Sequence, residues 1–184
     1  QLLQKIETSA TSMLDNVTQI LELSRLKSNK LTYNIAPFNA KEAIIEVVEK
    51  HQALALQHGV TITFDSACNE HACSISSDVF RLKQIASNIL SNAIKYSHGE
   101  VLVSTECSRG FWALHVEDNG DGIKDKEAVF NLFEQSANDI KTRAQEGTGI
   151  GLTFVKLLCE ELGFTYTLST SKTLGGLDFT LIKQ

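Results

Sequence analysis

The sequence predicts a protein of the α+β class, in which one long helix precedes a domain of mixed helices and strands. Three observations lead to this prediction. Residues 1–28 contain neither glycine nor proline and carry an apolar repeat with helical spacing. Several later segments alternate apolar and polar residues, as strands do. Two pairs of these segments are separated by short glycine-containing loops typical of hairpins, and this favours α+β over a doubly wound parallel sheet.

Composition narrows the class of protein further. The chain has 184 residues, 42% of them apolar, which is enough for one ordinary domain with a buried core and one additional element. Asp and Glu total 22 against 17 Lys and Arg, and the net charge of −5 argues against a nucleic-acid partner. No run of about 18 apolar residues occurs, so any membrane contact is expected only through missing parts of a parent protein. Because the chain does not begin with Met, we expect a fragment or a processed form.

The four cysteines match no zinc-binding spacing; they are Cys68, Cys73, Cys107 and Cys159. Cys159 lies in an apolar helical run, where we expect it to be a small core residue. For the others we expect the reduced thiols of a cytosolic protein, with a bond between Cys68 and Cys73 as the alternative.

Residues 1–30 are predicted to form one helix of a bundle. Apolar residues recur in steps of three and four, which is a heptad seam: Leu3, Ile6, Ala10, Met13, Val17 and Ile20. A single helix cannot bury this stripe against itself, so we expect self-association into a homodimer through this helix. Packing of the helix on the following domain is the alternative.

Residues 31–37 are predicted to be a linker, and residues 38–184 a separate domain. Pro37, the only proline, disfavours helix at the residue before it. Asn39 and Glu42 have the spacing of a capping box, and the helix that they begin should end at Gly59. Alternation from Val60 onwards predicts a strand, which is followed by a polar loop.

The central helix is predicted from about residue 78 to residue 96. Its apolar face has the spacing i, i+3, i+4, i+7. Gln84, Asn88, Asn92 and Lys95 form a second stripe, roughly opposite the first. Asn is a poor helix former, by roughly 0.5 kcal/mol relative to Ala. The stripe is therefore either an ordinary solvated face or a polar wall for a ligand that needs oxygen ligands and a cation, such as a magnesium–polyphosphate.

Two glycine clusters follow this helix. Asp118 begins the first cluster, residues 118–122, directly after a predicted strand, and its carboxylate could accept a hydrogen bond from an exocyclic amine such as that of adenine. The alternative is an ordinary turn. The second cluster, residues 147–152, begins a helix, where backbone N–H groups can bind phosphate. It matches neither the Walker pattern nor the dinucleotide fingerprint.

Taken together, these stretches resemble the sensor histidine kinases. Residues 88–97 are similar to their N box, residues 118–122 to the first glycine box, residues 130–134 to the F box, and residues 147–152 to the second glycine box. The resemblance covers about residues 38–184 as the catalytic, ATP-binding domain of the GHKL superfamily. It implies a two-layer α/β sandwich with a mixed sheet, the Bergerat-type ATP-binding fold. Residues 1–30 resemble the second helix of the dimerisation and phosphoacceptor hairpin.

The resemblance also implies a role for each matching residue. Asn88 and Asn92 would hold Mg²⁺, and the other nucleotide-binding residues would contact ATP or shape its pocket: Lys95, Tyr96, Asp118, Gly120, Gly122, Ile123, Phe133, Arg143, Gly147, Thr148, Gly149, Gly151 and Leu152. Asp118 would bind the adenine amine. Phe133 would anchor a lid at residues 135–146, from which Arg143 could reach the γ-phosphate. The implied cofactors are ATP and Mg²⁺.

The implied activity is transfer of the ATP γ-phosphoryl group to a histidine, for relay to the aspartate of a response-regulator receiver domain. ATPases of the superfamily resemble one another in having a Glu general base where this chain has Asn88, which cannot take a proton at neutral pH. No histidine of the sequence lies in a phosphoacceptor box, so the acceptor is expected upstream. The expected location is cytoplasmic, in a parent that is an inner-membrane sensor. The alternative is a degenerate kinase that acts as a regulatory nucleotide-binding or dimerisation module.

Overall fold

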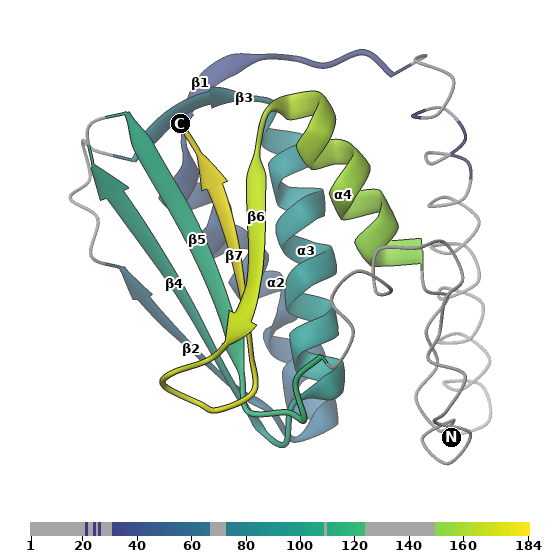
Figure 1. Ribbon diagram of the computed structural model, residues 1–184, viewed down its shortest axis with the longest axis vertical. Coiled ribbons are helices and arrows are strands. Elements are labelled where there is room, and N and C mark those ends of the chain that lie inside the picture. Colours follow the sequence, from purple (N-terminus) through teal and green to yellow (C-terminus); the bar gives the residue numbers. More distant parts are fainter. Residues whose placement is uncertain are drawn as a thin grey trace.

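The computed structural model describes Leu21, Ser24, Leu26 and residues 31–66, 73–108, 110–123 and 150–184 (Figure 1). Most of the predicted N-terminal helix lies outside the described residues. So do the predicted F box with Phe133, the predicted lid with Arg143, and most of the second glycine box, with Gly147, Thr148 and Gly149. The heptad seam and the lid therefore stay predictions. In the described part of the chain, no helix has the length and the apolarity needed to cross a membrane.

The main sheet has five strands in the order β2-β4-β5-β7-β6. These strands are β2 (Thr61–Ser66), β4 (Glu100–Ser108), β5 (Phe111–Asp118), β7 (Leu177–Lys183) and β6 (Thr165–Thr170). β2 is parallel to β4, whereas the other three pairs are antiparallel. The two predicted hairpins, β4–β5 and β6–β7, are both present. The prediction of an α+β fold with a mixed sheet is confirmed.

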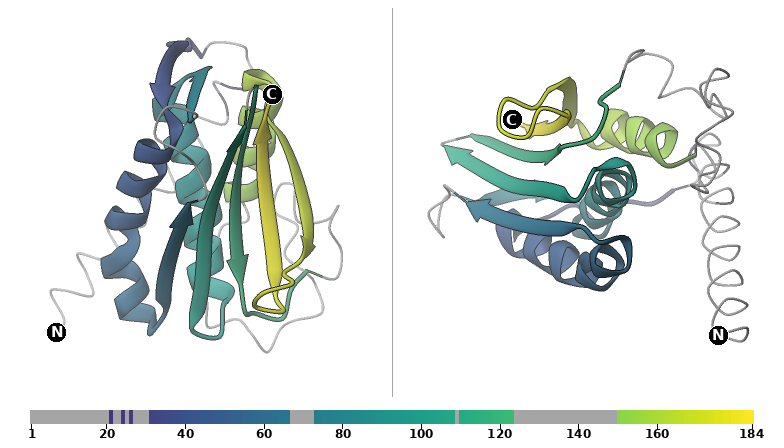
Figure 2. Two further views of the ribbon diagram at one scale, coloured as in Figure 1. Left: turned by 90° about the vertical axis from the view of Figure 1, so that its left-hand side faces the viewer. Right: turned by 90° about the horizontal axis from the view of Figure 1, so that it is seen from below.

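Three helices cover one face of this sheet, as both views of Figure 2 show. They are α2 (Ala40–His58), α3 (Val79–Tyr96) and α4 (Ile150–Leu162). In α3 the predicted apolar face is buried, with Leu82 and Ile85 fully enclosed. Truncation of such a buried leucine to alanine typically costs about 2–5 kcal/mol, so this face fixes α3 on the sheet. Since one side of α3 is buried in this way, its Asn-containing stripe is directed away from the core.

The bounds of α2 follow from its sequence caps. The Asn39 side-chain oxygen accepts hydrogen bonds from the N–H groups of Lys41 and Glu42, at 3.1 and 3.4 Å. The Asn39 side-chain amide donates to the Glu42 carboxylate at 3.0 Å, so the two predicted residues are paired through their side chains, whereas a capping box would use the backbone N–H of Asn39. Gly59 follows the helix with φ of 68°, a left-handed conformation that glycine adopts without steric cost.

The segment predicted as a linker is joined to the domain. β1 (Ala36–Asn39) pairs antiparallel with β3 (Ser74–Ser77), and this second sheet includes Pro37 as an edge-strand residue. Leu26 is buried in the core cluster, and Leu31 and Tyr33 pack against that cluster. Apolar side chains before residue 38 therefore contribute to the core. The domain boundary near residue 38 stays a prediction.

Cys73 and Cys107 form a disulfide, with their Cα atoms 5.6 Å apart. The expectation of reduced thiols is wrong for this pair, and the alternative partner for Cys73 was also wrong. The reason is the fold: Cys73 directly precedes β3 and Cys107 is the next-to-last residue of β4, two positions that are close in space and 34 residues apart in the chain. Cys159 is free and fully buried, as expected, and burial raises the pKa of its thiol to about 12.

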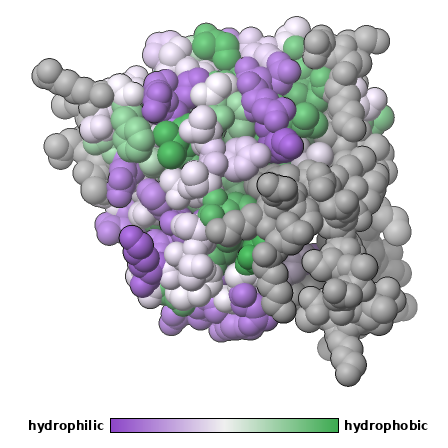
Figure 3. Space-filling view, viewed as in Figure 1, coloured by the Kyte–Doolittle hydropathy of each residue, from purple (hydrophilic) through white to green (hydrophobic). Residues whose placement is uncertain are grey.

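Surface composition agrees with this arrangement of the core. On the face shown in Figure 3, apolar residues form several small, separate groups among hydrophilic ones. The largest buried side chains lie instead between the helices and the sheet; they include Trp112, Phe154, Ile44, Leu82 and Leu114. The edge of the Trp112 ring meets the Phe164 ring, with centroids 6.4 Å apart.

Candidate functional site at the polar face of α3

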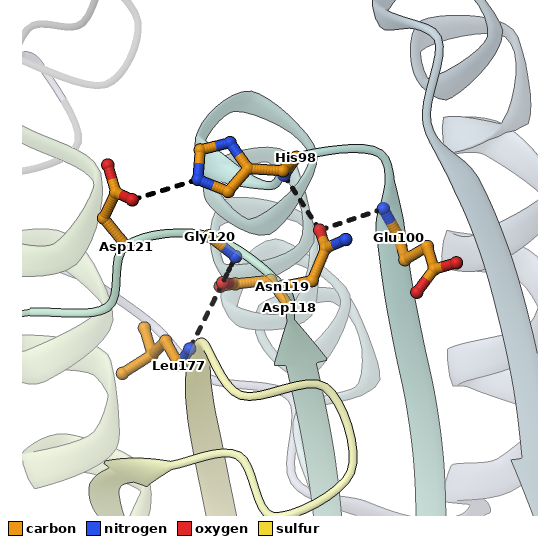
Figure 4. Close-up of polar contacts among 7 residues, drawn as sticks. All are labelled: His98, Glu100, Asp118, Asn119, Gly120, Asp121 and Leu177. Carbon is orange, nitrogen blue, oxygen red and sulfur yellow. Dashed lines mark hydrogen bonds and ion pairs between the residues drawn. The ribbon is translucent and has the colours of Figure 1, made fainter.

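Asp118 is the buried acid of the candidate site. It is the last residue of β5, and only 4% of its surface is exposed. Its Oδ1 atom accepts hydrogen bonds from the N–H groups of Gly120 at 2.8 Å and of Leu177 at 3.2 Å (Figure 4). Among the described residues, Oδ2 has no hydrogen-bond partner. Burial raises the pKa of the Asp118 carboxyl above its usual range, although the two backbone hydrogen bonds partly oppose this.

Two glycines allow the chain to approach Asp118 closely. A Cβ atom at Gly120 would lie 2.2 Å from the carbonyl oxygen of Tyr96, at the end of α3. A Cβ at Gly176 would lie 2.5 Å from both the carbonyl oxygen and Oδ1 of Asp118. No side chain fits at either position. Gly120 is a predicted site residue, but the sequence marked Gly176 only as part of a hairpin turn, and a Gly-Gly pair in a turn carries no signal of a site.

Asn119 fixes the loop after β5 against the end of α3. Its side-chain oxygen accepts hydrogen bonds from the N–H groups of His98 at 2.8 Å and Glu100 at 3.1 Å (Figure 4). His98 Nε2 also lies 3.0 Å from the Asp121 carboxylate, in an exposed pair. Asn119 and His98 were not predicted as site residues. Their roles depend on contacts between residues about 20 positions apart in the chain, and local sequence patterns do not reveal such contacts.

Asn88 lies about two helical turns before Tyr96, where α3 meets the start of α4. The Asn88 amide group donates to the Gln84 carbonyl oxygen at 2.9 Å, and this leaves its Oδ1 as the free acceptor of the carboxamide among the described contacts. A Cβ on Gly151 would lie 2.9 Å from that Oδ1 atom. Gly151 therefore brings the first turn of α4 against Asn88, and the predicted N box and second glycine box meet at this point.

The other predicted residues occupy the same helix and loops. Asn92 and Lys95 are half-buried on α3, and the Lys95 ammonium lies 5.7 Å from the centre of the Tyr96 ring. Gly122 adopts a φ of 68° in the exposed loop, and Ile123 follows it, half-buried. Leu152 packs against the core cluster from α4. Asn88, Asn92 and Lys95 thus lie along α3 between the Asp118 loop at one end and α4 at the other.

The side-chain oxygens of Asn88 and Asn92 suit a metal ion that takes its other ligands from water and phosphate. In the described residues, no group of three or more His, Cys, Asp or Glu side chains could hold a metal ion. Asn88 and Asn92 offer neutral oxygen ligands one helical turn apart. Mg²⁺ binds oxygen and is usually held by few protein groups together with substrate phosphates, so this sparse set fits Mg²⁺ better than a metal that needs a complete protein cage.

Four of the five histidines are in the described part of the chain, two of them on α2, and none stands in the sequence context of a phosphoacceptor box. His51 bonds to the Val47 carbonyl within α2, and His58 ends that helix. His98 lies in the turn between α3 and β4, where it contacts Asp121 of the loop after β5. His115 lies on β5, where its Nδ1 is 3.5 Å from the Asp178 carboxylate.

Comparison with known proteins identifies the family. Residues 77–183 match the family described as Histidine kinase-, DNA gyrase B-, and HSP90-like ATPase, and the chain belongs to this family. Within it, the chain is similar to sensor kinases. It is 30% identical over 167 residues to the sensor protein GacS of Pseudomonas syringae pv. syringae, which covers 86% of this chain and 18% of GacS.

Solved structures agree on the fold. The Acinetobacter baumannii histidine kinase AdeS matches with a TM-score of 0.77 at 24% identity, over 100% of this chain and 84% of that one. Full-length ShkA matches with a TM-score of 0.77 at 25% identity, over 94% of this chain and 35% of ShkA. The resemblance to sensor histidine kinases is confirmed. The chain spans less than a fifth of the length of the first curated relatives that it matches.

Proposed function

We propose that this chain is the ATP-binding catalytic domain of a sensor histidine kinase. The parent protein would transfer the γ-phosphoryl group of MgATP to a histidine outside this sequence, for relay to an aspartate of a receiver domain. The observation that carries the proposal is the Asp118 carboxylate: it is buried, Oδ1 is held by two backbone N–H groups, and Oδ2 has no partner in the described residues. A carboxylate oxygen that is left without a protein partner can accept a hydrogen bond from an amine donor of a ligand.

Each residue has a distinct part in the proposed site. Asp118 accepts the adenine amine through Oδ2, while Gly120, Gly122 and Ile123 leave room for the base. Tyr96 lines the nucleotide, and Lys95 lies beside it, able to approach a phosphate. The remaining predicted residues would bind the phosphates or close over them; Gly151 and Leu152 belong to the first turn of α4, and the others precede that helix in the sequence: Phe133, Arg143, Gly147, Thr148 and Gly149. The structure of ShkA was determined in complex with AMPPNP, an ATP analogue, which supports this assignment.

Asn88 and Asn92 would contribute oxygen ligands to Mg²⁺, which neutralises phosphate charge when it is bound. The Asn88 carboxamide cannot accept a proton from water at neutral pH, so at this position the chain provides no general base for hydrolysis. Gln84 fixes the orientation of that carboxamide through its carbonyl oxygen. The domain would hold ATP unreacted until a histidine reaches the γ-phosphate, and positioning would supply most of the acceleration.

The remaining parts of the proposal concern the parent protein. Residues 1–30 would form a homodimer with a second copy of the chain, and a response-regulator receiver domain would be the second partner. The domain would lie in the cytoplasm, where ATP is present, whereas the parent would be an inner-membrane sensor anchored by segments outside this sequence. The absence of a histidine in an acceptor context keeps one alternative open, a degenerate kinase that binds nucleotide and acts as a regulatory module.

A paired labelling assay tests the proposal. This chain should bind a fluorescent ATP analogue in a Mg²⁺-dependent manner, hydrolyse ATP very slowly and form no acid-labile phosphohistidine alone. A longer chain that contains the preceding helix should become labelled from γ-labelled ATP. Binding without labelling in either chain would favour the degenerate kinase. The absence of nucleotide binding would refute both functions, and steady phosphate release would indicate an ATPase.

A further inference from the structure

Asp78 connects two parts of the chain that are 44 residues apart. It lies between β3 and α3, and only 5% of its surface is exposed. Its Oδ1 atom accepts a hydrogen bond from the N–H of Arg81 at 3.1 Å, in the first turn of α3. Its Oδ2 atom accepts a hydrogen bond from the N–H of Asn34 at 2.8 Å. One buried carboxylate therefore holds both the start of α3 and the segment that precedes β1.

Helix capping alone does not account for this arrangement. An N-cap needs one side-chain oxygen, which Ser or Asn supplies about as well as Asp. The second oxygen of Asp78 instead binds a residue outside α3, in a segment without regular secondary structure. Because the carboxylate is buried and charged, each of its hydrogen bonds is stronger than one between neutral groups. Asp78 thus acts as a cap for α3 and as an anchor for residues 31–35.

The anchored segment is packed on the helices at the same end of the domain. Leu26 is buried in the core, and Tyr33 packs against that core. Burial and the nearby negative charges of Glu161 and Asp78 raise the pKa of the Tyr33 hydroxyl, although the charge of Arg81 opposes this. The hydrogen bond between Asn34 and Asp78 places this segment at the start of α3, and the core cluster that Tyr33 contacts includes Leu158 and Leu162 near the end of α4.

Asn88 is on the same helix, ten residues after Asp78, or about 15 Å along the axis. We propose that Asp78 is a positioning residue, which holds the segment leading to the N-terminal helix at a fixed place on α3, and so sets the distance between a helix-borne acceptor and the ATP site. The inference rests on the proposed function. Phosphoryl transfer needs reacting atoms within about 3–3.5 Å, so a loosened anchor should slow transfer without weakening ATP binding.

The test compares two substitutions that keep the helix cap with one that removes a neighbouring cap. Asp78→Asn keeps Oδ1 for Arg81 but places an amide donor opposite the N–H of Asn34. Asp78→Ser keeps one capping oxygen and removes the second. Asn39→Ala removes the N-cap of α2, five residues after Asn34, without changing either partner of the bond between Asn34 and Asp78. All three are made in a chain that includes the acceptor helix.

For both Asp78 variants we expect an unchanged KM for MgATP and a kcat for phosphohistidine formation that is lower by about tenfold, because orientation is lost and binding is not. Asn39→Ala should lower thermal stability and leave kcat unchanged. A wild-type kcat in both Asp78 variants would overturn the inference. An equal loss in Asn39→Ala, or a parallel loss of ATP affinity, would also overturn it, since either result indicates general destabilisation.

Amide hydrogen exchange tests the anchor independently of activity. The Asn34 amide should be protected in the wild-type chain and should exchange freely in Asp78→Asn, while the amides of the α3 interior stay protected in both. Free exchange of Asn34 in the wild type would refute the anchor even if the chain binds ATP normally. Failure to bind ATP or to form phosphohistidine in the wild type would instead refute the proposed function and leave the exchange result to decide on Asp78.

Discussion

Asp118→Asn should separate nucleotide binding from folding. The two carboxylate oxygens have different tasks: Oδ1 accepts the N–H groups of Gly120 and Leu177, and Oδ2 is proposed to accept the adenine amine. Asn keeps an oxygen for the first task and places an amide donor where the second needs an acceptor. A hydrogen bond to a charged group contributes roughly 1.5–3 kcal/mol, so we expect ATP affinity to fall about 10- to 150-fold.

Stability should change little in the same variant, and this is what makes the experiment decisive. Burial raises the pKa of the Asp118 carboxyl, which means that the folded chain disfavours the charge, and the neutral amide avoids this cost. Asp118→Ala is the matched control. It removes the acceptor of two N–H groups, each of which costs roughly 1–3 kcal/mol if left unsatisfied, so the control should lose stability as well as affinity.

The assay is isothermal calorimetry with MgATP, together with urea unfolding of the wild type and both variants. The pH dependence of ATP affinity provides a second test. Protonation removes the acceptor, so wild-type affinity should fall as the pH is lowered through the raised pKa of Asp118, and Asp118→Asn should lack this dependence. A folded Asp118→Asn that binds ATP as tightly as the wild type would refute the proposed role in adenine recognition.

Two further predictions concern residues around this site and on the open sheet. Gly176→Ala places a Cβ 2.5 Å from Asp118 atoms, so it should weaken ATP binding about tenfold or more and lower the melting temperature. Gly175→Ala is the control: its Cβ meets no atom, but the φ of 87° should cost roughly 1 kcal/mol of stability while ATP affinity is retained. Equal ATP affinities of the two variants in a titration would contradict the role of Gly176. The Asp178 carboxylate beside Nδ1 raises the pKa of His115. The stabilisation from this ion pair is therefore complete below the ordinary histidine pKa of about 6.5 and is lost as pH rises through the raised value. His115→Gln should therefore flatten the decline in unfolding free energy, by up to about 1 kcal/mol between pH 6 and pH 8.5 in urea titrations, and an unchanged slope would show that another group titrates.

Local patterns predicted the helices and hairpins well because their causes are local. The apolar repeat predicted a helix from about residue 78 to residue 96, and α3 spans Val79–Tyr96, with Asp78 as its N-cap. Gly59 ended α2 as expected, since a left-handed residue after a helix is a property of a few neighbouring residues. The glycine-containing loops predicted both hairpins for the same reason.

Features that depend on distant pairing could not be predicted in this way. The parallel partner of β2 is β4, which follows only after α3, and nothing within either strand specifies that choice. Gly176 read as a turn residue because the atoms that exclude its Cβ belong to Asp118, far earlier in the chain. The bond between Cys73 and Cys107 was missed on the same grounds.

The polar stripe of α3 has two interpretations in the sequence. The stripe alone could not distinguish a solvated face from a ligand wall, because both need only polar side chains on one side of a helix. The structure adds neighbours at two points: Gly151 comes within reach of the Asn88 oxygen, and Gly120 lies against the carbonyl of Tyr96. Each contact needs a residue without a side chain, and an ordinary solvated face has no such need. Backbone therefore approaches α3 closely both at Asn88 and at Tyr96. This favours the interpretation of the stripe as one side of a ligand site.

One consequence follows for how α3 could couple the rest of the chain to ATP. The helix is fixed to the sheet along its apolar side, and its start is capped by a carboxylate that also holds Asn34. Its end supports the Asp118 loop through the Tyr96 carbonyl. A rigid helix transmits displacement along its axis, whereas a loop absorbs it, so a shift of residues 31–35 that reached Asp78 would move Asn88 and Tyr96 together. The displaced segment and the nucleotide would then act on the same helix. Substitutions at Asp78 should slow phosphoryl transfer and substitutions at Asp118 should weaken ATP binding, with little overlap between the two effects.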